Sequence, residues 1–334
     1  MRFTLKKYYY QIAFFIGFYK FKITTKTSKM SYHSLRHLFI VSKGIFNDKI
    51  SEKISLKIGK YETLDIKGIL NFKSRKDLEN CVTEMKIKGY YIFKEKIPES
   101  VINDIYEIAL KTPCNYLNTL TQNYSDDKVL FDDTNPLGPR YEIDPSDVIN
   151  YLSIQKLIFD SSLLAFAQEY LGVKPILDLV AFWWSIPYEG KGKSAAAQMY
   201  HFDLDRIKFM KFFFYLTDVD TNTGPHCYVK GSHKTLPNEV NRDGRYSDEE
   251  ISKIYGVENL LEICGKKGTI MAVDTRGFHK GKELLKDKRL LFQIEFTNSM
   301  FGQTYPPMDI DYTNDIYKQI ANEYSYTYKQ ILVD

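Results

Sequence analysis

The sequence is poor in cysteine and contains no long apolar run. Its four cysteines lie far apart and form no CxxC pair, which excludes a disulfide framework and favours a reducing cytoplasm. The longest apolar stretch, YYYQIAFFIGFY at residues 8–19, is shorter than the roughly 20 residues that cross a bilayer. No small-residue cleavage site follows it. We therefore expect neither a transmembrane helix nor a signal peptide.

Acidic residues are scarce near the N-terminus. Residues 1–60 carry thirteen basic and two acidic side chains, a net charge of +11, whereas the rest carries 33 basic and 40 acidic side chains, a net charge of −7. Two interpretations of this basic segment stay open. Its first 22 residues mix Lys and Arg with Tyr, Phe and Ile, as in a peripheral amphipathic helix on the anionic inner face of a membrane. Alternatively, a helix and a strand pack on the main domain through their aromatic side chains.

The composition of the whole chain is typical of a folded, soluble protein. Of its 334 residues, 44% are hydrophobic and 26% are charged, which is enough to bury a large core beneath a polar surface. No nucleic-acid-binding module accompanies the basic charge, so we expect a small-molecule substrate and no nucleic acid. We divide the chain into a basic extension at residues 1–75 and a main domain at residues 76–334.

Helix signals dominate the first part of the main domain. Ser74 can cap a helix that runs to about Lys88 and ends at Gly89, and the following YYIFK favours a strand. Pro98 can then open a second helix, in which apolar residues recur at helical spacing.

The middle of the chain combines a loop-like segment with a helical one. Residues 115–147 are rich in Asn, Asp, Pro and Gly and have no hydrophobic period, so we expect a long surface loop. The segment SIQKLIFDSSLLAFAQEYLG, residues 153–172, predicts one or two amphipathic helices that end at Gly172.

From residue 177 the pattern changes to β-strands. Four segments are rich in β-branched and aromatic residues: LDLVAFWWSIP, RIKFMKFFFYLTDV, GTIMAVDT and RLLFQIEFTN. Helices followed by strands predict an α+β fold whose C-terminal half is a sandwich or barrel. A helical pattern returns after Pro306 and Pro307, and we expect this tail to pack on the outside of the barrel.

A histidine and an aspartate alternate in YHFDLD, directly before an aromatic run. In an extended chain, His201 and Asp203 point the same way, about 6–7 Å apart along the strand. With a second imidazole, they would form the 2-His-1-carboxylate triad of non-haem Fe(II), which leaves positions open for a co-substrate and O₂. Asp205 would lie about 13 Å from His201 in an extended strand. We therefore favour Asp203 as the carboxylate ligand.

The second imidazole can come from three histidines outside the basic extension. His226 and His233 both occur in the turn-rich segment TNTGPHCYVKGSHK, whereas His279 follows a strand and lies ten residues before Arg289. A dicarboxylate co-substrate needs a fixed guanidinium to hold its far carboxylate, and an Arg at the start of a strand provides one. Arg242, which lies at a similar offset from His233, belongs to a loop. We therefore favour His279.

At these residues the sequence resembles the phytanoyl-CoA dioxygenase family of Fe(II)- and 2-oxoglutarate-dependent oxygenases. The similar segments fall within residues 76–300 and include YHFDLD, YLTDVDTNTGPHCYVKGSH, and GFHKG followed by KRLLFQIEF. The resemblance implies a double-stranded β-helix of the jelly-roll or cupin type, flanked by N-terminal and C-terminal helices. It also implies that His201, Asp203 and His279 are the iron ligands and that Arg289 anchors 2-oxoglutarate.

The sequence departs from the family pattern in two places. Lys230 stands in KGSH where the family has the proline of a Pro-Gly-Ser-His turn, so a stiffening residue is lost. Residues 1–75 have no counterpart in the core family pattern.

Residues close to the ligands have two interpretations each. Lys211 lies in an aromatic strand, where it either contacts 2-oxoglutarate or an acidic substrate group, or is turned outward by a strand irregularity. Asp205 and Arg206 either form an ion pair or contact substrate at the mouth of the site. Of Trp183 and Trp184, one faces into the site and the other faces out.

The expected activity is the conversion of 2-oxoglutarate and O₂ into succinate and CO₂, coupled to oxidation of a C–H bond. Hydroxylation is the default reaction. Desaturation, alcohol oxidation or epimerisation would use the same oxidant. The intact Asp203 disfavours halogenation. Lys211 and Arg206 suggest a small polar substrate of anionic or sugar type. Two alternatives stay open: a non-catalytic cupin-like protein that binds a metal or ligand, and a membrane-surface partner of polysaccharide assembly that acts through its basic extension.

Overall fold

The computed structural model describes residues 2–189 and 197–332, and the side chains of residues 8–189 and 197–331. Residues 1, 190–196 and 333–334 lie outside the described part. They belong to the predicted basic extension (residue 1) and the predicted main domain (the others). The elements in chain order are α1 (Arg2–Thr24), α2 (Lys29–Val41), α3 (Ile45–Ile58), α4 (Arg75–Lys88), β1 (Tyr90–Lys96), α5 (Glu99–Lys111), β2 (Cys114–Asn118), β3 (Asn123–Tyr124), β4 (Arg140–Ile143), η1 (Pro145–Asp147), α6 (Leu152–Ile158), α7 (Ser161–Leu171), β5 (Ile176–Ser185), β6 (Phe209–Tyr215), β7 (His226–Val229), α8 (Asp248–Tyr255), η2 (Val257–Asn259), β8 (Leu260–Ile263), β9 (Thr269–Val273), β10 (His279–Gly281), β11 (Arg289–Thr297), β12 (Met308–Asp309), α9 (Asp315–Glu323) and β13 (Ile331–Leu332).

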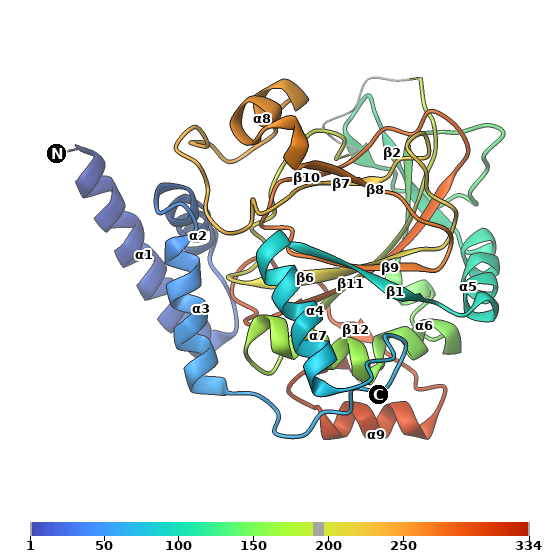
Figure 1. Cartoon of the computed structure of the whole chain (residues 1–334), viewed down its shortest axis with the longest axis horizontal. Coiled ribbons are helices and arrows are strands. Elements are labelled where there is room, and N and C mark those ends of the chain that lie inside the picture. Colours follow the sequence, from blue (N-terminus) through green and yellow to red (C-terminus); the bar gives the residue numbers. More distant parts are fainter. Residues whose placement is uncertain (1, 190–196, 333–334) are drawn as a thin grey trace.

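Two antiparallel sheets form the centre of the molecule (Figure 1). The large sheet has the strand order β1-β9-β6-β11-β5-β4-β2-β3, and the small sheet has the order β10-β7-β8. Side chains from four strands of the large sheet and two strands of the small sheet form one buried cluster, so the sheets pack face to face. The short strands β12 and β13 form a separate parallel pair. Helices combined with antiparallel sheets confirm the predicted α+β class.

Strand β6 lies between β9 and β11 in the large sheet, and all its side chains are buried. Phe212 and Phe214 belong to the main core, where helices α4, α5, α6 and α7 cover the outer face of the sheet. Phe213 and Tyr215 belong to the cluster that faces the small sheet. Alternation along an extended chain explains this division. Phe213 and Tyr215 therefore face the space between the two sheets.

The predicted helix boundaries in the main domain are confirmed. Ser74 accepts a hydrogen bond from the Asp77 amide at the start of α4, and Gly89 follows the helix with a φ of 89°. Pro98 precedes α5, and the predicted helical pair at residues 153–172 becomes α6 and α7, with Gly172 in a left-handed conformation after α7.

The prediction of a long surface loop at residues 115–147 is wrong. Strands β2, β3 and β4 lie in this region, and β4 pairs with β5 in the large sheet. Tyr141 and Ile143 are buried, whereas Arg140 and Glu142 are only partly covered. Buried and partly covered side chains thus alternate along β4, as expected for a strand. Four residues are too few to show this alternation in a segment rich in Asn, Asp, Pro and Gly. Its partner β5 lies more than thirty residues away in sequence.

Both ends of the described chain pack on the main domain. Phe14 of α1 contacts Phe301 at a ring-centroid distance of 5.2 Å, in a buried cluster that includes Leu35 of α2, Ile50 of α3 and Ile207. The basic extension has helices α2 and α3 where we expected a strand. Among the described residues, no helix combines the length and the hydropathy needed to span a membrane.

The C-terminal tail returns to helix, as the sequence predicts. Helix α9 follows the two prolines, and the tyrosine that follows it, Tyr324, lies in the main core with Tyr328. The Tyr328 ring lies 4.9 Å from the Phe159 ring at the end of α6. The tail therefore packs on the helices that cover the outer face of the large sheet.

Candidate metal centre

The backbone brings His201 and His279 together across a short antiparallel bridge. The His201 amide donates to the His279 carbonyl at 3.0 Å, and the His279 amide donates to the His201 carbonyl at 2.8 Å. The Asp203 amide donates to the Thr275 carbonyl at 2.8 Å. His201 and Asp203 come before β6 in the chain and belong to a separate extended segment. Backbone hydrogen bonds therefore fix both segments.

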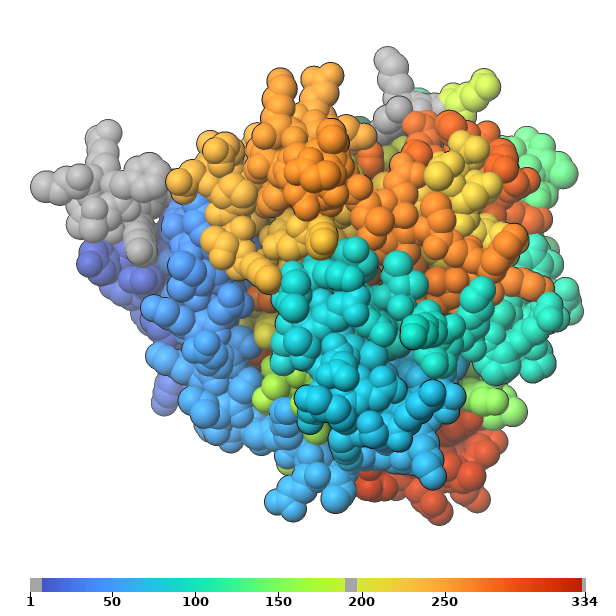
Figure 2. Space-filling view, viewed as in Figure 1, coloured from blue at the N-terminus to red at the C-terminus, as the bar shows by residue number. Residues whose placement is uncertain are grey.

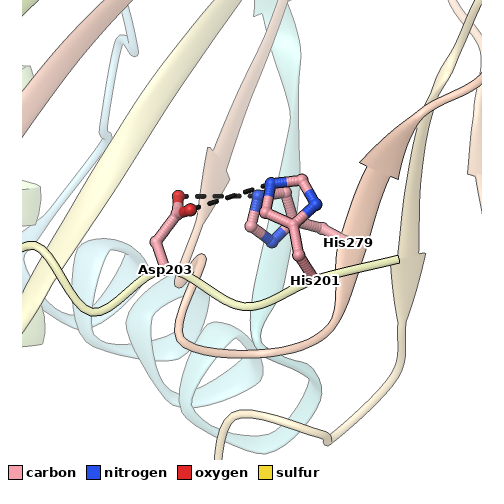
Figure 3. Close-up of side chains that lie close together, drawn as sticks. All are labelled: His201, Asp203 and His279. Atoms are coloured by element: carbon pink, nitrogen blue, oxygen red, sulfur yellow. Dashed lines mark ion pairs between the residues drawn. The ribbon is translucent and has the colours of Figure 1, made fainter. Parts of the chain in front are cut away.

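The three side chains predicted as metal ligands point toward one another (Figure 3). Asp203 Oδ1 lies 3.8 Å from His201 Nε2, and Asp203 Oδ2 lies 3.5 Å from His279 Nε2. One donor atom from each residue lies within 4.8 Å of the other two. Two imidazoles and one carboxylate are the donor set that proteins use for non-haem iron.

Both imidazoles have the tautomer that a metal ligand requires. His201 Nδ1 lies 2.9 Å from the Met199 carbonyl oxygen, and His279 Nδ1 lies 3.0 Å from the Gly277 carbonyl oxygen. A carbonyl oxygen only accepts hydrogen bonds, so each Nδ1 carries the hydrogen and each Nε2 keeps a lone pair. Burial lowers the pKa of both rings, to about 3 for His201. Because both imidazoles are neutral at neutral pH, the donor set fits Fe(II).

Lys211 faces the site and not the solvent. Its Nζ lies 2.8 Å from Asp203 Oδ2, 3.4 Å from Glu295 Oε2 and 3.7 Å from Asp205 Oδ2. Burial acts to raise the pKa of Asp203, but the Lys211 ammonium and the two imidazoles lower this pKa below its usual range. The outward orientation that we considered for Lys211 is therefore wrong, and the lysine supplies a counter-charge to the Asp203 carboxylate.

Arg289 lies in the wall of a cavity of about 180 Å³, which His201, Asp203, Lys211 and His279 also line. Its guanidinium donates to Ser185 Oγ at 3.1 Å and to the Gly224 carbonyl oxygen. Its Nε is buried without a hydrogen-bond partner, and burial lowers its pKa to about 10.

No carboxylate pairs with Arg289 within residues 2–189 and 197–332. A buried cation without a counter-charge is costly, and an anionic ligand in the cavity would offset that cost.

The two tryptophans of β5 have opposite orientations, as predicted. Trp183 lines the cavity together with Phe213 and Leu291, which gives the cavity an apolar side. Trp184 lies on the other face, where its ring stacks on Phe131 at 4.4 Å. Trp183 is therefore the tryptophan of the site.

Sequence reasoning missed Arg140 as a residue of the cavity, and it considered His226 only as a disfavoured metal ligand. His226 lies on β7, with its ring 5.5 Å from that of His279, and its buried Nε2 has no hydrogen-bond partner. Arg140 lies on β4, with its guanidinium 4.2 Å from the centre of the Trp183 ring. The Gly and Pro before His226 suggested a turn, although HCYV has the residue types of a strand. Arg140 was hidden in the segment that we predicted as a loop.

The prediction for Arg206 is wrong. Arg206 is fully buried, and its Nε and Nη2 donate to the two carboxylate oxygens of Asp178 at 2.5 Å each. It also donates to the Met300 carbonyl at 2.9 Å. The Arg206 guanidinium is occupied by Asp178 of β5. It therefore neither pairs with Asp205 nor reaches a substrate. His233, the ligand that we disfavoured, does not line the cavity and lies 3.1 Å from the Lys86 carbonyl through Nε2.

A 2-His-1-carboxylate donor set beside a buried arginine is typical of non-haem iron oxygenases that depend on 2-oxoglutarate, and the chain is an oxygenase of this class. The profile of the phytanoyl-CoA dioxygenase (PhyH) family matches residues 179–288, which confirms the resemblance inferred from the sequence. The matched segment contains the three donor residues.

Several solved structures have a similar chain course. AviO1 from Streptomyces viridochromogenes Tue57 is 14% identical, with a TM-score of 0.43 over 71% of this chain and 96% of that one. EctD from S. alaskensis is 12% identical, with a TM-score of 0.49 over 70% and 83%. HygX from Streptomyces hygroscopicus, solved with nickel and 2-oxoglutarate bound, is 14% identical, with a TM-score of 0.45 over 72% and 93%. No curated protein matches the sequence.

Proposed function

We propose that this protein binds Fe(II) through His201, Asp203 and His279 and uses 2-oxoglutarate and O₂ to oxidise a C–H bond of a small polar substrate. The observation that carries the proposal is the convergence of these three donors and the unpaired Arg289 guanidinium on one cavity. The two facing antiparallel sheets support a double-stranded β-helix as the fold.

Arg289 is the proposed anchor for the far carboxylate of 2-oxoglutarate. Its guanidinium can form the bidentate hydrogen bonds that a carboxylate accepts, and its place on β11 fixes its direction. Lys211 and His226 line the same cavity, so they are proposed to contact the part of the co-substrate nearer the metal. His226 Nε2 has no hydrogen-bond partner among the described residues, so in the tautomer with hydrogen on Nε2 it can donate to an oxygen of the co-substrate.

Iron, when bound, supplies the activation of O₂ that is coupled to conversion of 2-oxoglutarate into succinate and CO₂. The side chains of this protein position and shield that chemistry. Lys211 holds the outer oxygen of Asp203 at 2.8 Å, which keeps the carboxylate ionised and in one orientation. Trp183, Phe213 and Leu291 limit the access of water to the cavity.

The substrate is proposed to be small and polar, of anionic or sugar type. Arg206 does not support this proposal, but two other arginines do. Arg140 lines the cavity, and Arg245 has a buried Nη1 without a hydrogen-bond partner. Burial lowers the pKa of Arg245, while Asp203 acts to raise it, so the Arg245 charge lies close to the site. Hydroxylation is the proposed reaction. Desaturation, alcohol oxidation and epimerisation would use the same oxidant and differ from it in the placement of the substrate.

Reconstitution under anaerobic conditions tests the proposed function. The purified protein is loaded with Fe(II), 2-oxoglutarate is added, and succinate is measured after O₂ is admitted. We expect succinate to form, and to form faster when a sugar, a nucleotide-linked sugar or a small carboxylic acid that acts as substrate is present. Zinc-loaded protein is the control, because Zn²⁺ occupies similar donor sets without redox chemistry. Metal binding without any consumption of 2-oxoglutarate would support the alternative of a non-catalytic binding protein.

A second proposed function, contact with an anionic membrane surface, is favoured by the outer face of α1. Ile12, Ile16, Tyr19 and Ile23 are 61%, 54%, 67% and 69% exposed, and their spacing places them along one side of the helix. The opposite side packs on the main domain through Phe14. The chain has nine basic residues and no acidic residue before Asp48. An exposed apolar stripe within a basic segment suits a surface of anionic lipids.

Sedimentation with lipid vesicles tests this contact. We expect the protein to bind vesicles that contain phosphatidylglycerol and not vesicles of phosphatidylcholine alone, with binding that weakens as salt increases. An Ile12→Glu/Ile23→Glu variant should bind at least about tenfold more weakly, because two apolar side chains lose their burial in lipid. Leu120→Glu, at a position 93% exposed outside the extension, is the matched control. Equal binding by all three proteins would contradict the proposal.

A further inference from the structure

A second hollow, of about 640 Å³, lies between the basic extension and the main domain. Helix α3 forms one wall, and Lys86 of α4 and the end of α7 contribute others. Lys208, His233, Lys234 and Arg276 also line the hollow. Figure 2 shows this region as a depression between the blue helices of the extension and the cyan α4 segment, with α7 visible below. No residue of its lining also lines the 180 Å³ cavity. The hollow is therefore distinct from the metal centre.

Positive charge predominates in the hollow. Arg276 is neutralised, since its guanidinium contacts Asp274 at 2.8 Å and Asp48 at 2.9 Å. The lysines Lys86, Lys208 and Lys234 line the same hollow, and none of them has a carboxylate within ion-pair distance in the described part of the chain. Glu52 is the remaining acidic residue of the lining. Three ammonium groups therefore line one concave surface, and Glu52 is the one acidic residue of the described lining that is not paired with Arg276.

Lys208 is the most constrained of these lysines. It is partly buried beside Tyr170, with Nζ 5.3 Å from the centre of the ring. Its backbone carbonyl accepts hydrogen bonds from the Asn298 amide and the Thr297 hydroxyl, each at 3.0 Å, so the main chain at this position is fixed. Burial, together with the nearby Arg276 charge, lowers the pKa of Lys208 to about 8. A bound anion would compensate for this unpaired ammonium.

We propose that this hollow binds a small molecule through a phosphate group, held by Lys208, Lys86 and Lys234. Lysine ammonium groups suit phosphate, which can accept hydrogen bonds from several directions at once. Ser51 and Ser55 of α3 line the hollow as well and add hydroxyl groups to the set. The volume lies within the range of small-molecule sites. Because α3 forms one wall, the ligand would contact both the basic extension and the main domain.

Binding of inorganic phosphate, pyrophosphate and glycerol 2-phosphate to the full-length protein tests the proposal. Calorimetry at low ionic strength measures affinity, and the thermal midpoint measures stabilisation. We expect saturable binding of at least one probe in the millimolar range or tighter. Lys208→Met should weaken it by at least about tenfold, since a charge-assisted hydrogen bond is lost. If phosphate or pyrophosphate binds more tightly than glycerol 2-phosphate, the ligand is an inorganic anion. If glycerol 2-phosphate binds more tightly, the ligand is a phosphate ester.

Three further variants locate the binding. Lys266→Met removes an exposed lysine that pairs with Asp218, and it should not change the affinity. Arg289→Gln should also keep the affinity, because the hollow does not include the cavity at the metal centre. Lys234→Met should also weaken phosphate binding. Because Lys234 is exposed, this variant tests the proposal even if Lys208→Met unfolds. No saturable binding by the wild type, or equal affinities in the wild type and both hollow variants, would overturn the proposal.

Discussion

Replacing His279 with alanine is expected to weaken Fe(II) binding by at least about a hundredfold and to reduce succinate formation to background. Replacing a residue that only hydrogen-bonds to a metal ligand already reduces metal affinity by about 10–100-fold, and we expect removal of a ligand itself to reduce it more. His201 and Asp203 would remain, but two donors cannot fix the geometry that iron needs. Equilibrium dialysis with Fe(II) measures the binding, and succinate release measures the turnover.

The matched control for His279 is His233→Ala. His233 is also buried, and the turn-rich segment that contains it made it the alternative ligand in the sequence. It contacts the Lys86 carbonyl and does not line the cavity, so its replacement should leave iron binding intact. Retention of iron by His279→Ala, together with its loss in His233→Ala, would refute the proposed ligand set.

Replacing Arg289 with glutamine is expected to raise the KM for 2-oxoglutarate roughly a hundredfold, with little change in iron affinity. Truncating one partner of a buried charge pair costs about 2–5 kcal/mol, and each 1.4 kcal/mol is a factor of ten. The wild-type guanidinium has no carboxylate partner in the described part of the protein, and we propose that the co-substrate provides this counter-charge. Steady-state kinetics at saturating Fe(II) measure the effect.

Arg242→Gln is the control for Arg289. Arg242 is exposed, pairs with Glu250 at 2.7 Å and was the arginine associated with His233 in the sequence. Its replacement should leave the KM for 2-oxoglutarate unchanged. A similar KM in the wild type and Arg289→Gln would show that another group holds the far carboxylate.

The proposed metal ligands could be chosen from the sequence because their signals are local. His201 and Asp203 are two residues apart, and His279 is followed by a strand that begins with a suitable arginine. The same holds for β5, β6, β9 and β11, whose aromatic and branched residues identify them as strands. These features depend on neighbours in the chain, which a single sequence displays directly.

The misplaced residues depend on partners that are distant in sequence. Arg206 appeared to pair with the adjacent Asp205, but β5 carries Asp178 to it and buries both side chains. Arg140 reaches the cavity because β4 joins the edge of β5, and nothing in the composition of residues 115–147 indicates that pairing. Sheet order is set by the packing of whole elements, so a residue that depends on sheet order cannot be placed from its immediate surroundings.

The backbone bridge between His201 and His279 also bears on how the protein acquires iron. In zinc fingers the metal organises an otherwise unfolded chain, so removing it unfolds the domain. Here two main-chain hydrogen bonds align the segments of the proposed ligands, and carbonyl groups orient both rings. Chelation should therefore yield an intact apoprotein that regains activity on simple addition of ferrous salt.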